Sequence, residues 1–362
     1  MAMADERLKQ ASFMTRLMRR PELGAFSGSC WSRSSSTSWP AARCSLSGIL
    51  TFMSPAAQLG ILAIGAALLM VGGEFDLSVG SMVAFAGLVF GASVTALHLP
   101  LLPAILLTLA MAAAFGTLNG QIVLRTGLPS FIVTLAFLFI LRGLTLVGLK
   151  WATGGSTQMR GIREAVGDSV LAPLFSGQAL EGLFAWLAER GMIETFSSGL
   201  PKVTGIPVDI LWFFGIAAVA TIVLTRTRVG NWIFAAGGDA NAARNSGVPV
   251  ARVKTVLFIV TACCAALVAI LTVMDTGSTD ARRGFQKEFE AIIAAVIGGC
   301  LLTGGYGSAI GAFFGAIIFG MVLIGLTYTQ IDQDWYLVFL GGMLLIAVFF
   351  NNIVRKRATG ER

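Results

Sequence analysis

Long apolar stretches, repeated along most of the chain, constrain the fold of this protein more than any other feature. Only 12% of its 362 residues are charged and 56% are hydrophobic, whereas soluble domains carry roughly a quarter charged residues. A soluble fold of this composition would lack the polar side chains needed to cover its surface, so the excess apolar surface must face lipid. The sequence therefore predicts a multi-pass membrane protein, an all-α transmembrane helical bundle with about 9–10 spans.

The expected spans follow from the length of each apolar stretch, since a helix needs about 20 apolar residues to cross a membrane. The stretches are Ala57–Gly72, Leu77–Leu97, Leu101–Leu124, Ser130–Leu149, Ile210–Thr225, Val256–Met274, Ala291–Leu302, Ser308–Tyr328 and Trp335–Phe350. The first and seventh are short, so we expect them to be tilted, or broken at Gly72-Gly73 and Gly298-Gly299. Glycines spaced four apart indicate close helix packing, although glycine is also simply common in membrane helices; they are Gly87 and Gly91, Gly116 and Gly120, and Gly307, Gly311 and Gly315.

A polar island of small residues, residues 235–248, separates two of these stretches. Cationic residues flank it on both sides: Arg226, Arg228, Arg252 and Lys254. Basic residues gather on the cytoplasmic side of membrane proteins. We therefore expect residues 226–254 to form a cytoplasmic loop, and the polar connection 151–207, with an amphipathic piece near Leu180–Leu187, to lie outside.

The island itself has the pattern of a short capped helix. After a sharp entry at Gly237-Gly238, Asp239 is placed to cap the N-terminus of a helix over 240–245, and Gly247 to end it. A short helix held across a loop can dock in a groove of a partner protein. A solvated cytoplasmic loop is the alternative interpretation.

The parity of the spans indicates a missing first span. Five stretches precede the island, which would place the basic N-terminus, with Arg16, Arg19 and Arg20, outside. The Ser/Arg/Trp/Cys-rich segment 27–47 stands where a span is expected, and a shifted reading frame through it is able to encode apolar residues. A frameshifted first helix and an unusual but genuine N-terminus both remain open. We divide the chain into this N-terminal segment, 1–53, and a transmembrane domain, 54–362.

Several functions are excluded by what the sequence lacks. Its five cysteines form no Cys-x-x-Cys pair, and His98 is its one histidine, so we expect no metal site and no catalytic Ser-His-Asp set. The net charge of +7 comes from residues flanking apolar stretches rather than from a basic stripe with aromatics, which argues against nucleic acid. No phosphate-binding Gly-x-x-x-x-Gly-Lys-Ser/Thr loop occurs, so ATP would have to bind a partner chain.

Four passages in order resemble one family. They are Gly72–Ser81 (Gly-Gly-Glu-Phe-Asp-Leu-Ser-Val-Gly-Ser), Leu128–Leu135 followed by Leu141-Arg142-Gly143, the island segment Gly237–Gly247, and Glu290–Gly299 followed by Gly304–Gly307. Together they resemble the permease subunits of bacterial ABC importers for monosaccharides, typified by the ribose, xylose and galactose systems. The resemblance runs from about Ser54 to Arg357 and departs at 27–47, where family members carry an apolar first helix.

The resemblance implies a transport subunit of the bacterial inner membrane rather than an enzyme. It implies two ATP-binding cassette subunits as partners, which would bind the ATP, together with a periplasmic sugar-binding protein, membrane lipid and a second permease copy. A homodimer is expected, and a heterodimer stays open. In the family the island is the coupling helix, and this role is carried here to Gly237, Gly238, Asp239, Ala242, Ala243, Arg244 and Gly247. The substrate is expected to be a monosaccharide or polyol.

Polar residues within the apolar stretches are candidates for a translocation path or gate: Asp76, Ser78, Ser81, Asn119 and Thr134. For Asp76 the alternative is an N-cap for a helix that starts at Leu77. Arg142 lies inside a span, so we expect it to face the bundle interior or to snorkel. A secondary transporter or channel is the alternative function and would need intramembrane ionisable residues for coupling. For a membrane enzyme the sequence supplies no catalytic set.

Overall fold

The computed structural model describes residues 46–196, 200–328 and 335–359. The helices are α3 (Leu46–Val71), α4 (Val79–Thr95), α5 (Leu101–Thr126), α6 (Ser130–Thr153), α7 (Ile162–Val166), the 3₁₀ helix η2 (Ala172–Leu174), α8 (Glu181–Glu189), α9 (Val208–Arg226), α10 (Arg228–Gly238), α11 (Ala240–Asn245), α12 (Val250–Thr276), α13 (Lys287–Ile297), α14 (Ala309–Tyr328) and α15 (Trp335–Thr359). Short strands pair antiparallel, β1 (Gln158–Met159) with β4 (Thr279–Asp280) and β2 (Gln178–Ala179) with β3 (Ile206–Pro207). The predicted all-α class is confirmed.

Within the described residues, six helices are long and apolar enough to cross a membrane: α3, α5, α6, α9, α12 and α14. Helix α4 and the segment Trp335–Phe349 of α15 are shorter apolar helices. Every stretch that the sequence marked as a span overlaps a helix, but several boundaries differ. Helix α12 begins at Val250 rather than Val256, and α15 extends to Thr359 rather than Phe350. Helix α3 begins at Leu46 rather than Ala57, and α13 covers Lys287–Ile297 rather than 291–302. The predicted breaks are confirmed, because Gly73 and Gly299 adopt φ values of 81° and 88° just after α3 and α13 end.

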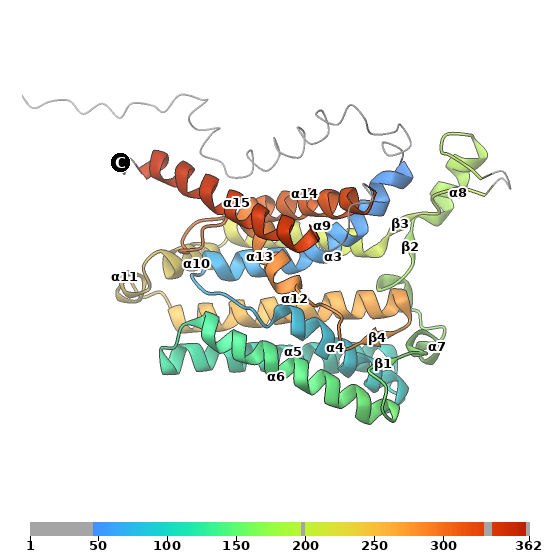
Figure 1. The fold of residues 1–362 in the computed structure, drawn as a ribbon, viewed down its shortest axis with the longest axis horizontal. Helices are drawn as coiled ribbons and strands as arrows, with labels where there is room; N and C mark the ends of the chain where they lie inside the picture. Colours follow the sequence, from blue (N-terminus) through green and yellow to red (C-terminus); the bar gives the residue numbers. More distant parts are fainter. Residues whose placement is uncertain (1–45, 197–199, 329–334, 360–362) are drawn as a thin grey trace, which may run out of the picture.

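The two ends of the bundle carry different structures. Helices α10 and α11 lie at one end, which we call the island end, and α7 and α8 lie at the other, which we call the loop end (Figure 1). Helix α3 runs from the loop end, where the Ser54 hydroxyl donates to Asp209 of α9 at 2.5 Å, to the island end. This direction agrees with the sequence analysis, in which five spans before a cytoplasmic island require the first of them to start on the outer side. The segment 27–45 and the basic residues before it lie outside the described residues.

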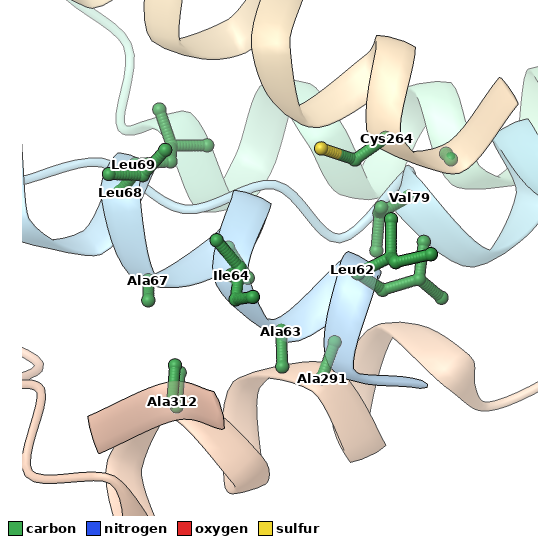
Figure 2. Packing of buried hydrophobic residues seen from close by; sticks show 14 of the residues in the cluster. Leu62, Ala63, Ile64, Ala67, Leu68, Leu69, Val79, Cys264, Ala291 and Ala312 are labelled. Carbon is green, nitrogen blue, oxygen red and sulfur yellow. The ribbon is translucent and has the colours of Figure 1, made fainter. Parts of the chain in front are cut away.

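Helix α3 forms the centre of the bundle. In its apolar window 83% of residues are buried, against 33% in α5, α6 and α9, so α3 has no broad face for lipid and the other three do. Figure 2 shows why: Leu62, Ala63 and Ala67 of α3 lie among side chains of α12, α13 and α14. The small side chains of Ala63, Ala67, Ala291 and Ala312 allow the helices to approach closely.

Two connections re-enter the bundle in place of continuous helices. Residues 74–78 link α3 to α4, and residues 281–286 link β4 to α13. The starts of α4 and α13 meet inside the bundle, because a Cβ on Gly80 would overlap with the Gly284 carbonyl and the Glu288 carboxylate. Non-helical backbone at membrane depth is tolerated where protein surrounds it. Interrupted helices of this kind mark substrate or ion sites in other transporters.

Candidate coupling and translocation sites

The island folds as the sequence predicted. The Asp239 carboxylate accepts the backbone N–H groups of Asn241 and Ala242 at 2.9 and 3.0 Å, which caps α11. Gly247 has a φ of 82°, and the Val248 N–H donates to the Ala243 carbonyl at 3.0 Å as the chain leaves the helix. The N-cap and the glycine stop are both confirmed. The segment that leads into α11 differs from the prediction, because Gly237 and Gly238 form the last turn of α10 instead of a loop.

The side chains of the island divide into an outward and an inward set. Ala243 is only 5% exposed and packs into the core. Its side chain therefore supports the helix from behind and does not lie on the exposed face of the island, and the coupling role that the resemblance gives it stays a prediction. The residues of the predicted coupling set that are exposed are Gly238, Asp239, Ala242, Arg244 and Gly247.

A glycine junction, formed by Gly73, Gly237, Gly304 and Gly305, joins the island to the bundle. Gly237 ends α10, Gly73 follows α3, and Gly304 and Gly305 lie between α13 and α14. A Cβ on Gly304 would lie 2.7 Å from both the Gly237 carbonyl oxygen and the Gly73 Cα, and the Gly305 N–H donates to the Val71 carbonyl at 2.9 Å. Three segments distant in sequence thus meet backbone to backbone.

An ion pair forms a second link at the same end. The Lys254 ammonium, on the first turns of α12, lies 2.5 Å from the Glu74 carboxylate in the connection between α3 and α4. Both side chains are 12% exposed. From the sequence we identified Lys254 only as a cation beside the island and predicted no partner for Glu74. In the structure the two form an ion pair.

A polar cluster fixes the start of α4. The Asp76 carboxylate accepts the Ser78 N–H at 2.8 Å and the Ser78 hydroxyl at 2.5 Å, and the Asn119 amide donates to the Ser78 hydroxyl at 3.2 Å. The Leu77 N–H donates to the Thr134 hydroxyl at 3.1 Å. The structure therefore brings Asp76, Ser78, Asn119 and Thr134 together. Asp76 caps the turn before α4, but the helix starts at Val79 rather than Leu77.

Unpaired polar atoms from three helices surround the start of α4. Among the described side chains, buried atoms without a hydrogen-bond partner include Ser81 Oγ, Asn119 Oδ1 and Glu288 Oε2. Glu288 is 4% exposed and its carboxylate reaches Gly80 on the first turn of α4. Sequence reasoning missed Glu288. Its signal was a carboxylate three residues before the apolar stretch that starts at Ala291.

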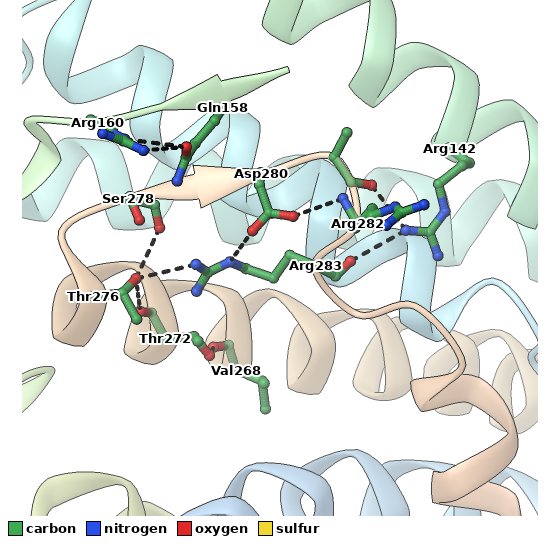
Figure 3. A network of polar contacts seen from close by, with 11 residues as sticks. Arg142, Gln158, Arg160, Val268, Thr272, Thr276, Ser278, Asp280, Arg282 and Arg283 are labelled. Carbon is green, nitrogen blue, oxygen red and sulfur yellow. Dashed lines mark hydrogen bonds and ion pairs between the residues drawn. The ribbon is translucent and has the colours of Figure 1, made fainter. Parts of the chain in front are cut away.

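Arg142 faces the bundle interior, as expected. Its guanidinium donates from Nη1 to the carbonyls of Ala281 and Arg283 at 3.1 and 3.3 Å and lies 5.6 Å from the Phe285 ring centroid. Figure 3 shows it beside the connection that leads to α13. Backbone carbonyls and an aromatic face surround the guanidinium, and the Glu288 carboxylate, distant in sequence, interacts with its charge. Arg142 thus holds the re-entrant segment 281–286 in position.

No cluster of three or more histidine, cysteine or acidic side chains occurs in the described part of the chain. In the buried Glu288 it is Oε2 that lacks a hydrogen-bond partner, and the other buried acids have side-chain partners. Glu290, for example, accepts from Lys287 at 2.5 Å and from the Tyr336 hydroxyl at 2.6 Å. The sites consist of hydroxyls, amides and paired charges, which suit hydrogen bonding and conformational coupling.

Comparison with known proteins agrees with this arrangement. Residues 48–348 match the family described as "Branched-chain amino acid transport system / permease component". The chain is 31% identical over 293 residues to the ribose import permease protein RbsC of Escherichia coli K12, covering 81% of each chain. It is also 31% identical over 329 residues to the xylose transport system permease protein XylH of the same organism, covering 83% of each. No solved structure matches significantly.

A third relative, the ribose import permease protein RbsC of Haemophilus influenzae, is 30% identical over 309 residues and covers 85% of this chain. The part of this chain that matches the family, residues 48–348, contains nearly all of α3, every helix from α4 to α14 and the first half of α15. The island, the glycine junction and both re-entrant connections lie inside it. This chain is a multi-pass permease of the inner membrane and belongs to the branched-chain amino acid transport system / permease component family.

Proposed function

We propose that this chain forms the membrane path of an ATP-driven importer for a monosaccharide or polyol, and that a separate ATPase subunit drives it by binding the island. The relatives named for ribose and xylose supply the substrate class. The observation that carries the proposal is the island itself, a capped helix that exposes one face and packs the other face onto the bundle.

The exposed face of the island is suited to a partner protein. Asp239, Ala242 and Arg244 point away from the core, and Ala243 behind them fixes the helix. A short helix presented this way fits a groove, which is a recurrent mode of peptide recognition. We place this contact on the cytoplasmic side, because Arg226, Arg228 and Arg252 flank the helices of the island.

Two links transmit a displacement of the island to the re-entrant connections. The glycine junction connects α10 to the residues that precede 74–78 and to the loop between α13 and α14. The ion pair of Lys254 and Glu74 connects α12 to the same segment. A nucleotide-dependent shift of the island therefore reaches the starts of α4 and α13, where the unpaired polar atoms lie. In this proposal the starts of α4 and α13 form the gate of the translocation path.

The composition of that gate fits a neutral solute rich in hydroxyl groups. Ser78, Ser81, Asn119 and Thr134 donate and accept hydrogen bonds without a net charge, and a hydroxyl-bearing solute matches such groups. The exposed apolar side chains of α5, α6 and α9 would be covered by lipid and a second permease copy. A periplasmic sugar-binding protein would deliver the solute at the loop end.

One observation favours the alternative of an ion-coupled secondary transporter. Glu288 is buried with a free carboxylate oxygen inside the bundle, and intramembrane acids of this kind serve proton or sodium coupling in many transporters.

A single experiment separates the two functions. The permease, its ATPase and its binding protein are reconstituted in liposomes, and uptake of labelled ribose and xylose is measured with and without ATP.

The proposal expects uptake that needs ATP and survives a protonophore and a sodium ionophore. The matched control replaces the ATPase with a variant that binds ATP and does not hydrolyse it, and this control is expected to remove uptake. Uptake that proceeds without the ATPase and collapses with the ion gradient would instead establish the secondary transporter.

A further inference from the structure

A cavity of about 200 Å³ opens at the loop end, far from the coupling island. Four segments surround it: the first part of α3, the chain near β2, the start of α9 and the end of α12. The side chains that give it chemical character are Ser54, Gln58, Phe175, Gln178, Asp209 and Asp275. Gln178 and Asp275 are exposed, so the cavity is reached from the surface.

Asp209 is the polar centre of the cavity wall. Its side chain accepts from the Ser54 hydroxyl at 2.5 Å, from the Gln58 amide at 3.2 Å and from the Ile210 N–H at 2.8 Å. The residue is 9% exposed. A carboxylate offers about four acceptor sites, and three donors hold this one in a fixed orientation. One acceptor site remains for a ligand.

An aromatic wall stands beside these polar groups. The Phe175 ring stacks on the Trp212 ring with a centroid separation of 5.7 Å and an interplanar angle of 27°. The Trp212 indole N–H donates to the Leu174 carbonyl at 2.8 Å, which ties the loop that carries Phe175 to α9. The apolar wall is therefore held by stacking and a hydrogen bond instead of lying on a free loop.

The combination favours a small uncharged ligand over a metal ion. In the described residues no group of three or more acidic, histidine or cysteine side chains is placed to hold a metal, and the three donors around Asp209 leave it a single acceptor site. Pockets for drug-sized ligands span roughly 300–1,000 Å³, so a cavity of about 200 Å³ suits a solute of monosaccharide size. The hydroxyl groups of such a solute would contact the carboxylate and amide side chains of the cavity, and the apolar face of a sugar ring would pack against Phe175.

We infer that this cavity is a binding site for a neutral monosaccharide or polyol at the outer end of the permease. Asp209, Asp275 and Gln58 hydrogen-bond the hydroxyl groups, and Phe175 packs against the ring. The inference rests on the proposed function for its substrate class and for the side of the membrane. It adds a solute site within one chain that is separate from the polar cluster at the start of α4.

The test uses the full chain in lipid nanodiscs, without ATPase or binding protein. Equilibrium binding of tritiated D-ribose, D-xylose and myo-inositol is measured for the wild type and for Asp275→Asn, Gln58→Leu and Phe175→Leu. Asp168→Asn is the matched control, since it makes the same change on an exposed residue that does not line the cavity. We expect saturable binding of at least one sugar by the wild type and the control, and a loss of about tenfold in affinity, equal to about 1.4 kcal/mol, for Asp275→Asn.

The inference is overturned if folded wild-type protein binds none of the three solutes, or if the cavity variants bind as well as the control. A calcium chloride titration that displaces the sugar only in proteins with Asp275 intact would identify a cation site and overturn it as well. Size-exclusion profiles and unfolding temperatures establish that each variant is folded. ATP-driven uptake that persists without measurable cavity binding would leave the importer in place and remove only this site.

Discussion

The Lys254 ammonium and the Glu74 carboxylate, 180 positions apart in the chain, lie 2.5 Å from each other at the island end of the bundle. Both are largely buried. Removing one partner of a buried pair leaves an uncompensated charge and costs roughly 3–5 kcal/mol. We expect Lys254→Met to lower the unfolding temperature of the detergent-solubilised protein sharply, and the double variant Lys254→Met/Glu74→Gln to recover most of the loss. Equal unfolding temperatures for the single and double variants would show that the pair is not coupled.

The glycine junction offers a matched pair of substitutions on consecutive residues. A Cβ on Gly237 would collide with the backbone at Val71 and Gly305, whereas a Cβ on Gly238 meets open space. Overpacking a tight contact costs typically 1–3 kcal/mol. We expect Gly237→Ala to reduce ATP-driven uptake strongly and to lower stability, and Gly238→Ala to leave both close to wild type. A Gly237→Ala protein with normal uptake would contradict the proposed transmission through the junction.

Neighbouring alanines of α11 separate docking from folding. Ala242 is exposed and Ala243 is 5% exposed. We expect Ala242→Glu to yield a folded permease that no longer co-purifies with the ATPase, because the new charge is desolvated at the contact. Ala243→Glu should instead reduce the yield of folded protein, since the carboxylate would have to enter the core. Undiminished ATPase binding by folded Ala242→Glu would remove the assigned role of this face.

Loss of the Asp239 cap should loosen the island without unfolding the bundle. The carboxylate satisfies two backbone N–H groups at the start of α11, and removing such a cap costs about 0.5–2 kcal/mol. Asp239→Ala is therefore expected to speed amide hydrogen exchange over 240–247 by roughly two- to thirtyfold, given that 1.4 kcal/mol is tenfold. Asp239→Asn, which also caps well, should stay near wild type. Identical exchange in the alanine variant would mean that packing alone holds α11.

Local signals along the chain were sufficient to predict most helices and the shape of the island. The length of the apolar stretches gave α5, α6, α9, α12 and α14, and the spacing of Asp239 and Gly247 gave α11 with its cap and stop. These features depend on neighbouring residues alone. The breaks at Gly73 and Gly299 were also visible, because glycine pairs interrupt short apolar stretches.

Features that depend on distant segments were not predictable. Nothing near Lys254 indicates Glu74 as its partner, and Ala243 looks like any other alanine of a polar helix until the fold buries it. The start of α13 was placed four residues late, because Lys287 and Glu290 read as polar loop residues. In the structure the distant Tyr336 donates to Glu290, beside the local ion pair of Glu290 with Lys287.

At the glycine junction, carbonyl and α-carbon atoms touch directly. Side chains at an ordinary helix contact can change rotamer and absorb part of an imposed shift, but a main chain without Cβ atoms has no such freedom. A push on α10 is therefore delivered to α3 and to the loop before α14 with little slack. In the proposed importer, the displacement that reaches the membrane centre would depend on how far the ATPase moves the island, and loosening this backbone contact would reduce that displacement before it weakened ATPase binding.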